Sequence, residues 1–132
     1  MVLGERMDKR SLEWLRQADY DIDTAEFMFA GGRFFYAVFM CHLSVEKAIK
    51  ALYQQRLKQT PPKTHNLIYL LKKIDIRPAE ANGRFIVKLN EASVVTRYPE
   101  DIDKLHKQYT EDIVKNLLAE SKEVLEWIKA QF

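Results

Sequence analysis

The sequence predicts an all-α protein that folds as an up-and-down antiparallel bundle of the four-helix type, with one or two extra short helices. Apolar residues recur at intervals of three or four over long stretches, which is the spacing of one helix face. Glycine or proline interrupts these stretches at four places: Gly31-Gly32, Pro61-Pro62, Pro78 and Pro99. No segment shows the alternation of apolar and polar residues expected of a strand. Short connections between helices favour antiparallel neighbours and hence a bundle.

The chain of 132 residues has the length of one domain, and we predict a single domain over residues 1–132. Its 47% hydrophobic and 30% charged residues are typical of a soluble globular protein. No apolar run approaches the roughly 20 residues of a membrane-spanning helix, so we expect no membrane association. The net charge of +2, from 21 basic and 19 acidic residues, is too balanced to indicate bulk nucleic-acid binding.

Cysteine usage and the start of the chain bear on location. Cys41 is the only cysteine, which excludes an intrachain disulfide and is typical of proteins from a reducing compartment. The segment from Met1 to Arg10 has neither the apolar stretch nor the small-residue cleavage site of a secretory signal. We therefore expect a cytoplasmic protein.

Two long helices are predicted first. The first runs from Lys9 to Ala30 and is apolar on one face, and Gly31-Gly32 supplies its end and a tight turn. The second runs from Phe34 to Lys58 and is apolar over most of its girth, which indicates a central helix with neighbours on several sides. The inward residues of the first helix are Leu15, Ala18, Ile22, Ala25 and Phe29. Those of the second are Phe34, Val38, Cys41, Val45, Ala48 and Leu52.

Three further helices follow with weaker signals. A short helix from His65 to Ile74 is predicted with Thr64 as its N-cap. The next lies between Pro78 and Pro99, because the residue before a proline avoids helical geometry. The last begins near Thr110, where acidic residues suit the positive end of the helix dipole. For the loop from Tyr98 to Gln108 we make no structural prediction.

Four segments, in order, resemble elements of the HEPN family of helical domains. The second helix carries Val45-Glu46-Lys47-Ala48-Ile49-Lys50-Ala51-Leu52, preceded by Gly32-Arg33-Phe34-Phe35-Tyr36-Ala37, and this is similar to the signature helix of the family. The first helix matches through Trp14-Leu15, Ala18, Asp21-Ile22 and Ala25. Lys63-Thr64-His65-Asn66-Leu67 resembles the His-Asp-Leu element, with Asn66 in place of the acidic residue, and Arg97-Tyr98-Pro99 resembles the Arg-Tyr-Pro element. The resemblance extends from Trp14 to Pro99.

The resemblance implies a helical bundle that forms a homodimer. Members of the family are often encoded beside a minimal nucleotidyltransferase, and such pairs can behave as toxin and antitoxin. Some members are metal-independent ribonucleases, whereas others bind nucleotides or act as non-catalytic partners. The leading hypothesis for this chain is a non-catalytic module that acts with a nucleotidyltransferase and binds nucleotide or phosphate. The alternatives are a metal-independent ribonuclease toxin with a divergent active site, which would act on RNA, and a simple dimerisation scaffold.

The ribonuclease branch of the family uses an arginine followed four to six residues later by a histidine. In this sequence the three nearest pairs each have eight intervening residues: Arg33 and His42, Arg56 and His65, and Arg97 and His106. On an unbroken helix such a step places the first pair on opposite faces. The sequence therefore argues against the enzyme, and His65 and Arg97 remain only weak catalytic candidates across the loops.

Glu46, Lys47 and Asp21 are predicted to face a ligand or a partner chain. One interpretation of Glu46 and Lys47 is a solvated helix face, in which Glu46 pairs with Lys50 one turn away. The other is a polar patch at the rim of an apolar helix. Asp21 lies one residue from the apolar stripe of the first helix, and the resemblance favours a pairing with Lys47 or Arg97.

His65, Arg97 and Tyr98 are the remaining candidates for the site. His65 opens a predicted helix, where it could anchor a loop or join Arg97 or Tyr98 around a phosphate, since helix starts bind anions. Arg97 and Tyr98 could equally clamp the loop before Pro99. Cys41 and His42 are adjacent and diverge, so we predict no metal site, and we also expect no cofactor. Trp14 and the run Phe34-Phe35-Tyr36 are interpreted as core or dimer contacts.

Overall fold

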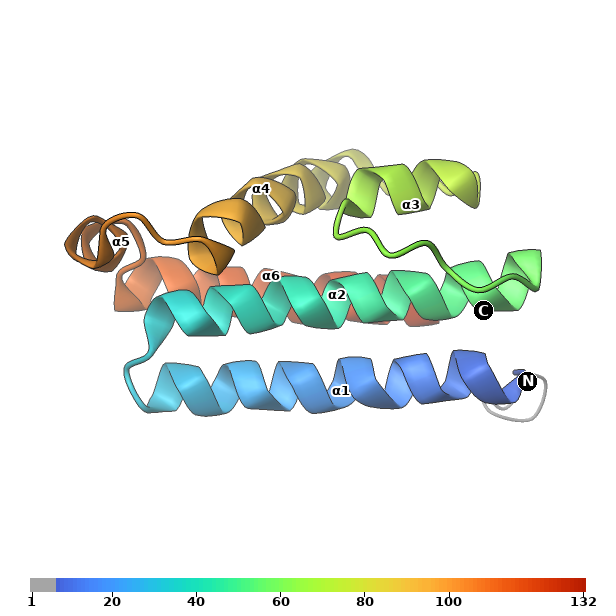
Figure 1. Cartoon of the computed structure of the whole chain (residues 1–132), viewed down its shortest axis with the longest axis horizontal. Helices are drawn as coiled ribbons and strands as arrows, with labels where there is room; N and C mark the ends of the chain where they lie inside the picture. The colour runs from blue at the N-terminus through green and yellow to red at the C-terminus, as the bar shows by residue number, and fades with distance from the viewer. Residues whose placement is uncertain (1–6) are drawn as a thin grey trace.

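Two long antiparallel helices form the frame of the protein in a computed structural model, which describes residues 7–132. They are α1 (Lys9–Ala30) and α2 (Phe34–Leu57), and they lie side by side along the long axis of the molecule (Figure 1). The hydroxyl of Ser44 on α2 donates a buried hydrogen bond of 2.6 Å to the carbonyl of Ala18 on α1. Small side chains at this contact let the two backbones approach closely.

Local signals in the sequence explain where α1 begins and ends. Asp8 is the N-cap, and its carboxylate accepts a hydrogen bond from the backbone N–H of Ser11 at 2.8 Å. At the other end the N–H of Gly31 bonds to the carbonyl of Phe27. Gly32 then takes φ = +75°, a left-handed conformation that glycine adopts without steric cost, and the chain reverses into α2.

The remaining helices are α3 (Leu67–Lys73), α4 (Glu80–Arg97), α5 (Ile102–Gln108) and α6 (Glu111–Lys129). In Figure 1, α6 lies behind α2, α3 and α4 lie above it, and α5 closes the end near the α1–α2 turn. The helix α2 packs against α1, α3, α4, α5 and α6. The prediction of a central second helix is therefore confirmed, as is the all-α bundle, since the described residues form six helices and no strand.

The core is built around α2, which contributes more buried residues than any other helix of the described chain. The largest fully buried aliphatic side chains come from α2, α3, α4 and α6: Ile49, Leu52, Leu67, Leu70, Ile86, Leu89, Leu117 and Ile128. The C-terminal end is tied to the same frame, because the guanidinium of Arg56 on α2 donates to the carbonyl of Gln131 at 2.8 Å.

The short helices differ from the sequence prediction. The N-cap of α3 is Asn66, whose side chain accepts from the backbone N–H groups of Ile68 and Tyr69, so the predictions of a start at His65 and of Thr64 as the cap are wrong. The segment from 98 to 108, for which we made no prediction, contains α5, which is capped by the side chain of Asp101. The predicted and observed ends of α1, α2 and α4, and the predicted and observed starts of α6, agree to within a residue or two.

Within residues 7–132, no helix combines the length and the apolar character that crossing a bilayer would need. The predictions that involve Met1 to Arg10 fall partly on residues 1–6, which lie outside the described residues.

Candidate functional site

Charged side chains are buried on the second half of α2. The carboxylate of Glu46 is almost fully enclosed and lies 3.1 Å from the ammonium of Lys50, one turn further along the helix. The same ammonium lies 5.7 Å from the ring centroid of Trp14 on α1, a cation–π distance. The interpretation of Glu46 and Lys50 as a solvated helix face is therefore wrong, because the neighbouring helices cover this part of α2.

A second ion pair joins α2 to α1 beside the first. Oδ2 of the buried Asp21 lies 2.8 Å from Nζ of Lys47. Of the two partners predicted for Asp21, Lys47 and Arg97, the structure shows Lys47. Because one partner is buried and the other is mostly so, removing either charge would leave the other in a poorly solvated place.

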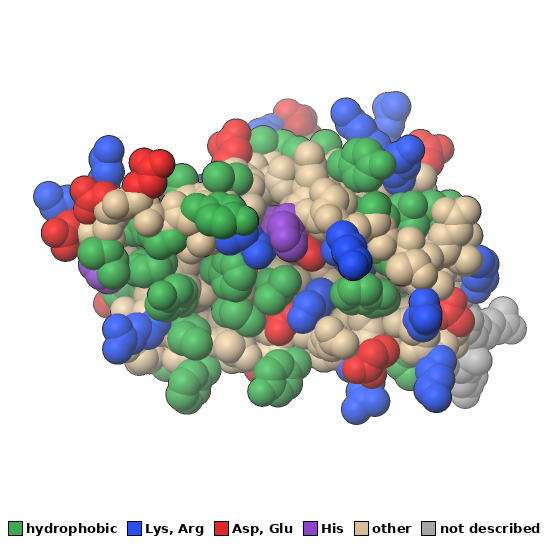
Figure 2. Space-filling view, in the orientation of Figure 1, with side chains coloured by type: hydrophobic (Ala, Val, Ile, Leu, Met, Phe, Trp, Pro, Cys, Tyr) green, Lys and Arg blue, Asp and Glu red, His purple; other side chains and the backbone are tan. Residues whose placement is uncertain are grey.

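His65, in the loop before α3, is a second partner of the Glu46 carboxylate. Its Nδ1 lies 2.7 Å from Oε1 of Glu46, so this nitrogen carries a proton that it donates to the carboxylate. The side chain of His65 is 54% exposed, which leaves its second nitrogen, Nε2, available to solvent or to a ligand. In Figure 2 a histidine side chain lies over the middle of α2, among blue and red charged side chains.

Asn90 on α4 fixes this loop against the bundle. Its side-chain oxygen accepts a hydrogen bond of 3.0 Å from the backbone N–H of Leu67, and its amide donates to the side chain of Asn66 at 3.3 Å. The first turn of α3 is thereby attached to α4. This attachment sets the position of His65, which directly precedes the cap.

His42 lies one turn before Glu46 on α2 and is fully buried. Burial lowers the pKa of His42 from 6.5 to about 4, and the charge of Arg97 acts in the same direction. The carboxylate of Glu46, the side chain of Asn90 and the backbone of His65 raise this pKa, but less than burial lowers it. Within residues 7–132 neither ring nitrogen has a partner at good hydrogen-bond geometry. His42 is therefore a neutral imidazole near neutral pH.

Arg97, at the last position of α4, reaches back over α2. Its guanidinium lies 4.7 Å from the ring centroid of Phe39, a cation–π contact. Its Nη2 atom is buried, and no hydrogen-bond partner for it exists in the described chain. The residue as a whole is only half-buried, so solvent still reaches part of it. Its charge is therefore only partly compensated by the protein.

We call this set of residues the polar cluster: Asp21, His42, Glu46, Lys47, Lys50, His65, Asn90 and Arg97. The polar cluster lies along one side of α2. Arg97, from the last turn of α4, is at one end of it, and His65, from the loop before α3, is towards the other. Lys47 and Lys50 pair with the two carboxylates, Arg97 adds a further basic side chain, and the exposed nitrogen of His65 adds a group that can donate or accept. Positive charge in partly dehydrated surroundings attracts anions, so the chemistry of the polar cluster suits a phosphate.

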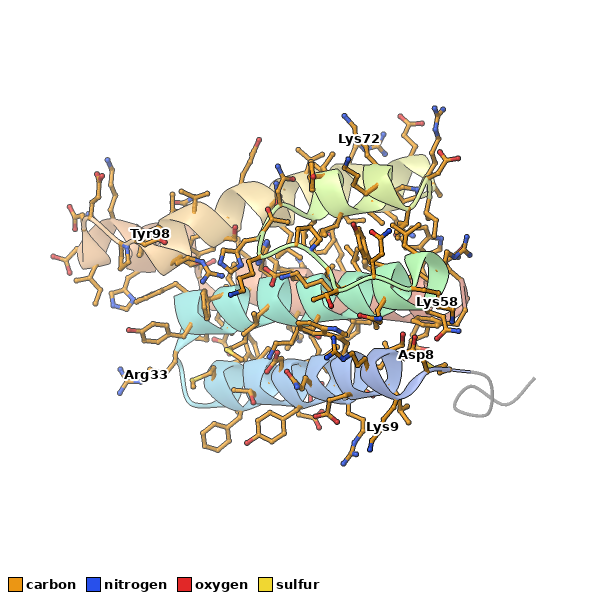
Figure 3. The ribbon with its side chains drawn as sticks, turned by 45° about the vertical axis from the view of Figure 1, so that its right-hand side comes forward. Asp8, Lys9, Arg33, Lys58, Lys72 and Tyr98 are labelled. Carbon is orange, nitrogen blue, oxygen red and sulfur yellow. The ribbon has the colours of Figure 1, made fainter. Side chains whose placement is uncertain are left out.

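The structure thus places Glu46, His65 and Arg97 around His42, and it pairs Asp21 with Lys47 on the next position of α2. Tyr98 differs, because it is 71% exposed and contributes no contact to the polar cluster of the described chain; Figure 3 shows it at the end of α4. His42 and Asn90 were not among the predicted site residues. His42 could have been found, since it shares a face with Glu46 at a spacing of four, whereas nothing in the sequence distinguishes Asn90 from a surface asparagine.

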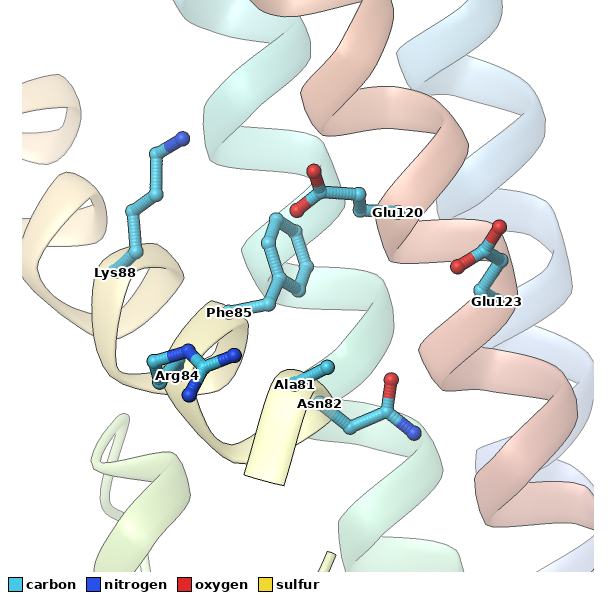
Figure 4. A pocket seen from close by; sticks show the side chains of 7 residues that line it. All are labelled: Ala81, Asn82, Arg84, Phe85, Lys88, Glu120 and Glu123. Carbon is cyan, nitrogen blue, oxygen red and sulfur yellow. The ribbon is translucent and has the colours of Figure 1, made fainter. Parts of the chain in front are cut away.

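One hollow of the surface lies apart from the polar cluster. The hollow shown in Figure 4, of about 370 Å³, lies between α4 and α6 and is lined by Arg84, Lys88, Glu120 and Glu123 around Phe85. Two cations and two carboxylates balance there, so this hollow does not favour an anion. Among residues 7–132 no three His, Cys, Asp or Glu side chains come close enough to hold a metal ion.

Comparison with known proteins gives the same fold. The model of the HEPN domain family matches residues 11–131. The crystal structure of ST0689, an archaeal HEPN homologue, is 25% identical and covers 94% of this chain and 98% of its own, with a TM-score of 0.74. The crystal structure of TT1696 from Thermus thermophilus is 21% identical and covers 95% of this chain and 100% of its own, with a TM-score of 0.79.

None of the curated proteins compared with the chain matches it significantly. The family model, however, extends over nearly all of the sequence and reaches every helix described above. The chain belongs to the HEPN domain family.

Proposed function

We propose that this HEPN domain is a non-catalytic, homodimeric module that binds the phosphate groups of a nucleotide at the polar cluster and acts with a minimal nucleotidyltransferase partner, as one member of a toxin–antitoxin-like pair. Partnership with a nucleotidyltransferase is a frequent property of the family. Binding of phosphate rests on the geometry of the polar cluster.

The main support for phosphate binding is an unpaired hydrogen-bond donor on Arg97. One of its guanidinium nitrogens is buried without a partner in the described chain, while the rest of the side chain reaches solvent beside Phe39. An unpaired buried donor is costly, and a bidentate phosphate is the ligand that best satisfies a guanidinium. The exposed Nε2 of His65, held in place by Glu46, supplies a second contact on the same side of α2.

The non-catalytic assignment rests on spacing. None of the three arginine–histidine pairs in the sequence has the four to six positions of the ribonuclease branch. One of these arginines, Arg56, donates to the C-terminal end of the chain instead of approaching His65.

Exposed aromatic residues support a homodimer. Tyr20 and Phe27 on α1 are 74% and 75% exposed, and at a spacing of seven they share one face of the helix. Large exposed apolar side chains that gather on one face mark interaction surfaces. Light scattering after size exclusion should report a dimer for the wild type and a monomer for Phe27→Asp. A monomeric wild type would remove the dimer from the proposal.

Nucleotide binding is tested by titration calorimetry with ADP. Charge-assisted hydrogen bonds are worth about 1.5–3 kcal/mol, so Arg97→Ala should weaken binding by about 10- to 150-fold. Arg97→Lys keeps the charge but not the fork of donors, and its affinity should fall between those of the wild type and Arg97→Ala. Arg84→Ala is the matched control, because it removes an arginine from α4 outside the polar cluster. Equal affinity of wild type and Arg97→Ala would contradict the proposal.

A ribonuclease is the second candidate, and one observation favours it. The 2.7 Å hydrogen bond from His65 to Glu46 orients the imidazole as a carboxylate orients a catalytic histidine. Incubation with cellular RNA in the presence of a chelator decides between the two. We expect no cleavage by the wild type. Cleavage that is lost in both Arg97→Ala and His65→Ala would establish the enzyme and refute the non-catalytic role.

A further inference from the structure

A hollow of about 320 Å³ opens at the N-terminal half of α2, next to the polar cluster. It is lined by Met28 of α1, Tyr36, Phe39 and Met40 of α2, and Thr96 of α4. Small-molecule sites have volumes of about 300–1,000 Å³, so the hollow is large enough for one small group rather than a whole cofactor. Apart from two hydroxyl groups, its lining side chains are apolar.

The hollow and the polar cluster form one continuous strip along α2. Phe39 connects the two, because it lines the hollow while its ring centroid lies 4.7 Å from the guanidinium of Arg97, a member of the polar cluster. From Tyr36 to Lys50 the strip extends about 21 Å at the rise of an α-helix. Figure 2 shows the same order, with green side chains near the α1–α2 turn and charged ones over the middle of α2.

The chemistry of the strip matches the two ends of a nucleotide. A phosphate at Arg97 would place the group attached to it next to an apolar hollow bordered by aromatic rings. Tyr36 supplies the open aromatic surface, since it is 49% exposed, and its ring is supported by Phe35 at 4.6 Å between centroids. Planar bases stack on such rings, and a mobile apolar side chain such as that of Met40 adapts to a flat ligand.

We infer that the hollow of Met28, Tyr36, Phe39, Met40 and Thr96 is the base subsite of the proposed nucleotide site. This inference rests on the proposed function for the phosphate end and adds the recognition of the base. The Thr96 hydroxyl already donates to the carbonyl of Ala92 at 2.9 Å, which leaves few directional donors to distinguish one base from another. Stacking therefore dominates, and ADP and GDP should bind with similar affinity.

The test compares ADP with pyrophosphate, a probe that lacks a base, by titration calorimetry. Removal of a stacking aromatic residue costs about 1–3 kcal/mol per base, so Tyr36→Ala should weaken ADP binding by about 5- to 150-fold and leave pyrophosphate unchanged. Tyr36→Phe keeps the ring and should bind ADP like the wild type. Tyr69→Ala is the matched control, because it removes an exposed tyrosine of α3 outside the hollow and outside the proposed dimer face. Met40→Ala should weaken ADP binding selectively as well.

Each other outcome overturns the inference in a distinguishable way. If wild type binds ADP no better than pyrophosphate, the base subsite fails while the phosphate site stands. If Tyr36→Ala weakens both probes equally, the residue supports the fold rather than a base. If Tyr36→Ala leaves ADP affinity intact but converts a dimer into a monomer, a second copy of the chain covers the hollow. If neither probe binds, the proposed function fails together with the inference.

Discussion

Mild acid should destabilise the protein through His42, whose imidazole is fully buried on α2. Burial lowers the pKa of His42 from 6.5 to about 4, with Arg97 acting in the same direction and Glu46 opposing it. The unfolded chain therefore binds a proton at a higher pH than the folded protein does. Above pH 6.5 His42 does not lower the free energy of unfolding. As the pH drops from about 6.5 towards about 4, the free energy of unfolding falls.

The size of this effect follows from the two pKa values. At about 1.4 kcal/mol per pH unit, the interval between 6.5 and about 4 corresponds to about 3–4 kcal/mol. For a small domain with a stability of about 5–15 kcal/mol, that is a large fraction of the total. Below the folded pKa both states bind the proton, and His42 adds no further loss.

Urea unfolding across this pH range measures the effect. Carboxylates also titrate there, so the informative quantity is the difference between wild type and His42→Gln, which cannot take up the proton. The two curves should differ in slope between pH 6.5 and about 4 and run parallel below it. His106→Gln, which removes an exposed imidazole on α5, is the matched control. The same slope in wild type and His42→Gln would mean that His42 takes up no proton on unfolding in this pH range.

Three further predictions concern other buried groups and a helix cap. Burial raises the pKa of the Cys41 thiol to about 12, so the native protein should resist iodoacetamide and react only on unfolding; rapid alkylation of folded protein would contradict this burial. Glu46→Gln leaves Lys50 buried without its counter-charge and should lower the free energy of unfolding by about 3–5 kcal/mol, measured in urea; a loss below about 1 kcal/mol would mean that water reaches the pair. Asn66→Ala removes the α3 cap and should cost about 1 kcal/mol by the same assay, whereas Thr64→Ala should cost less; the reverse order would mean that Thr64 is the cap.

The ends of a helix could be predicted from the sequence where capping residues and glycines mark them clearly. The helix α1 has the predicted ends because Asp8 caps its start and the glycine pair permits the reversal at Gly32. The helix α5 escaped prediction because seven residues span only about two turns, too few to show an apolar face. Its one signal was the capping side chain of Asp101.

The contacts within the polar cluster could not be predicted from the periodicity of the sequence. A pattern of charges on a helix predicts a face in water, yet Glu46 and Lys50 are buried. Their partners include groups from other elements, such as His65 from the loop before α3 and Trp14 from α1. The contact of Arg97 with Phe39 likewise depends on how α4 crosses α2, which neither local sequence determines.

If the strip along α2 binds a nucleotide as proposed, ADP can be mapped on the isotope-labelled protein by amide chemical shifts. We predict shifts over residues 36–50 of α2, at His65 to Leu67, and around Thr96 and Arg97. The apolar hollow of about 550 Å³ between α3 and α4, near Lys72 and Arg77, is the internal comparison and should stay unshifted. Shifts confined to that hollow, or none at a saturating concentration of ADP, would mean that the strip along α2 does not bind a nucleotide.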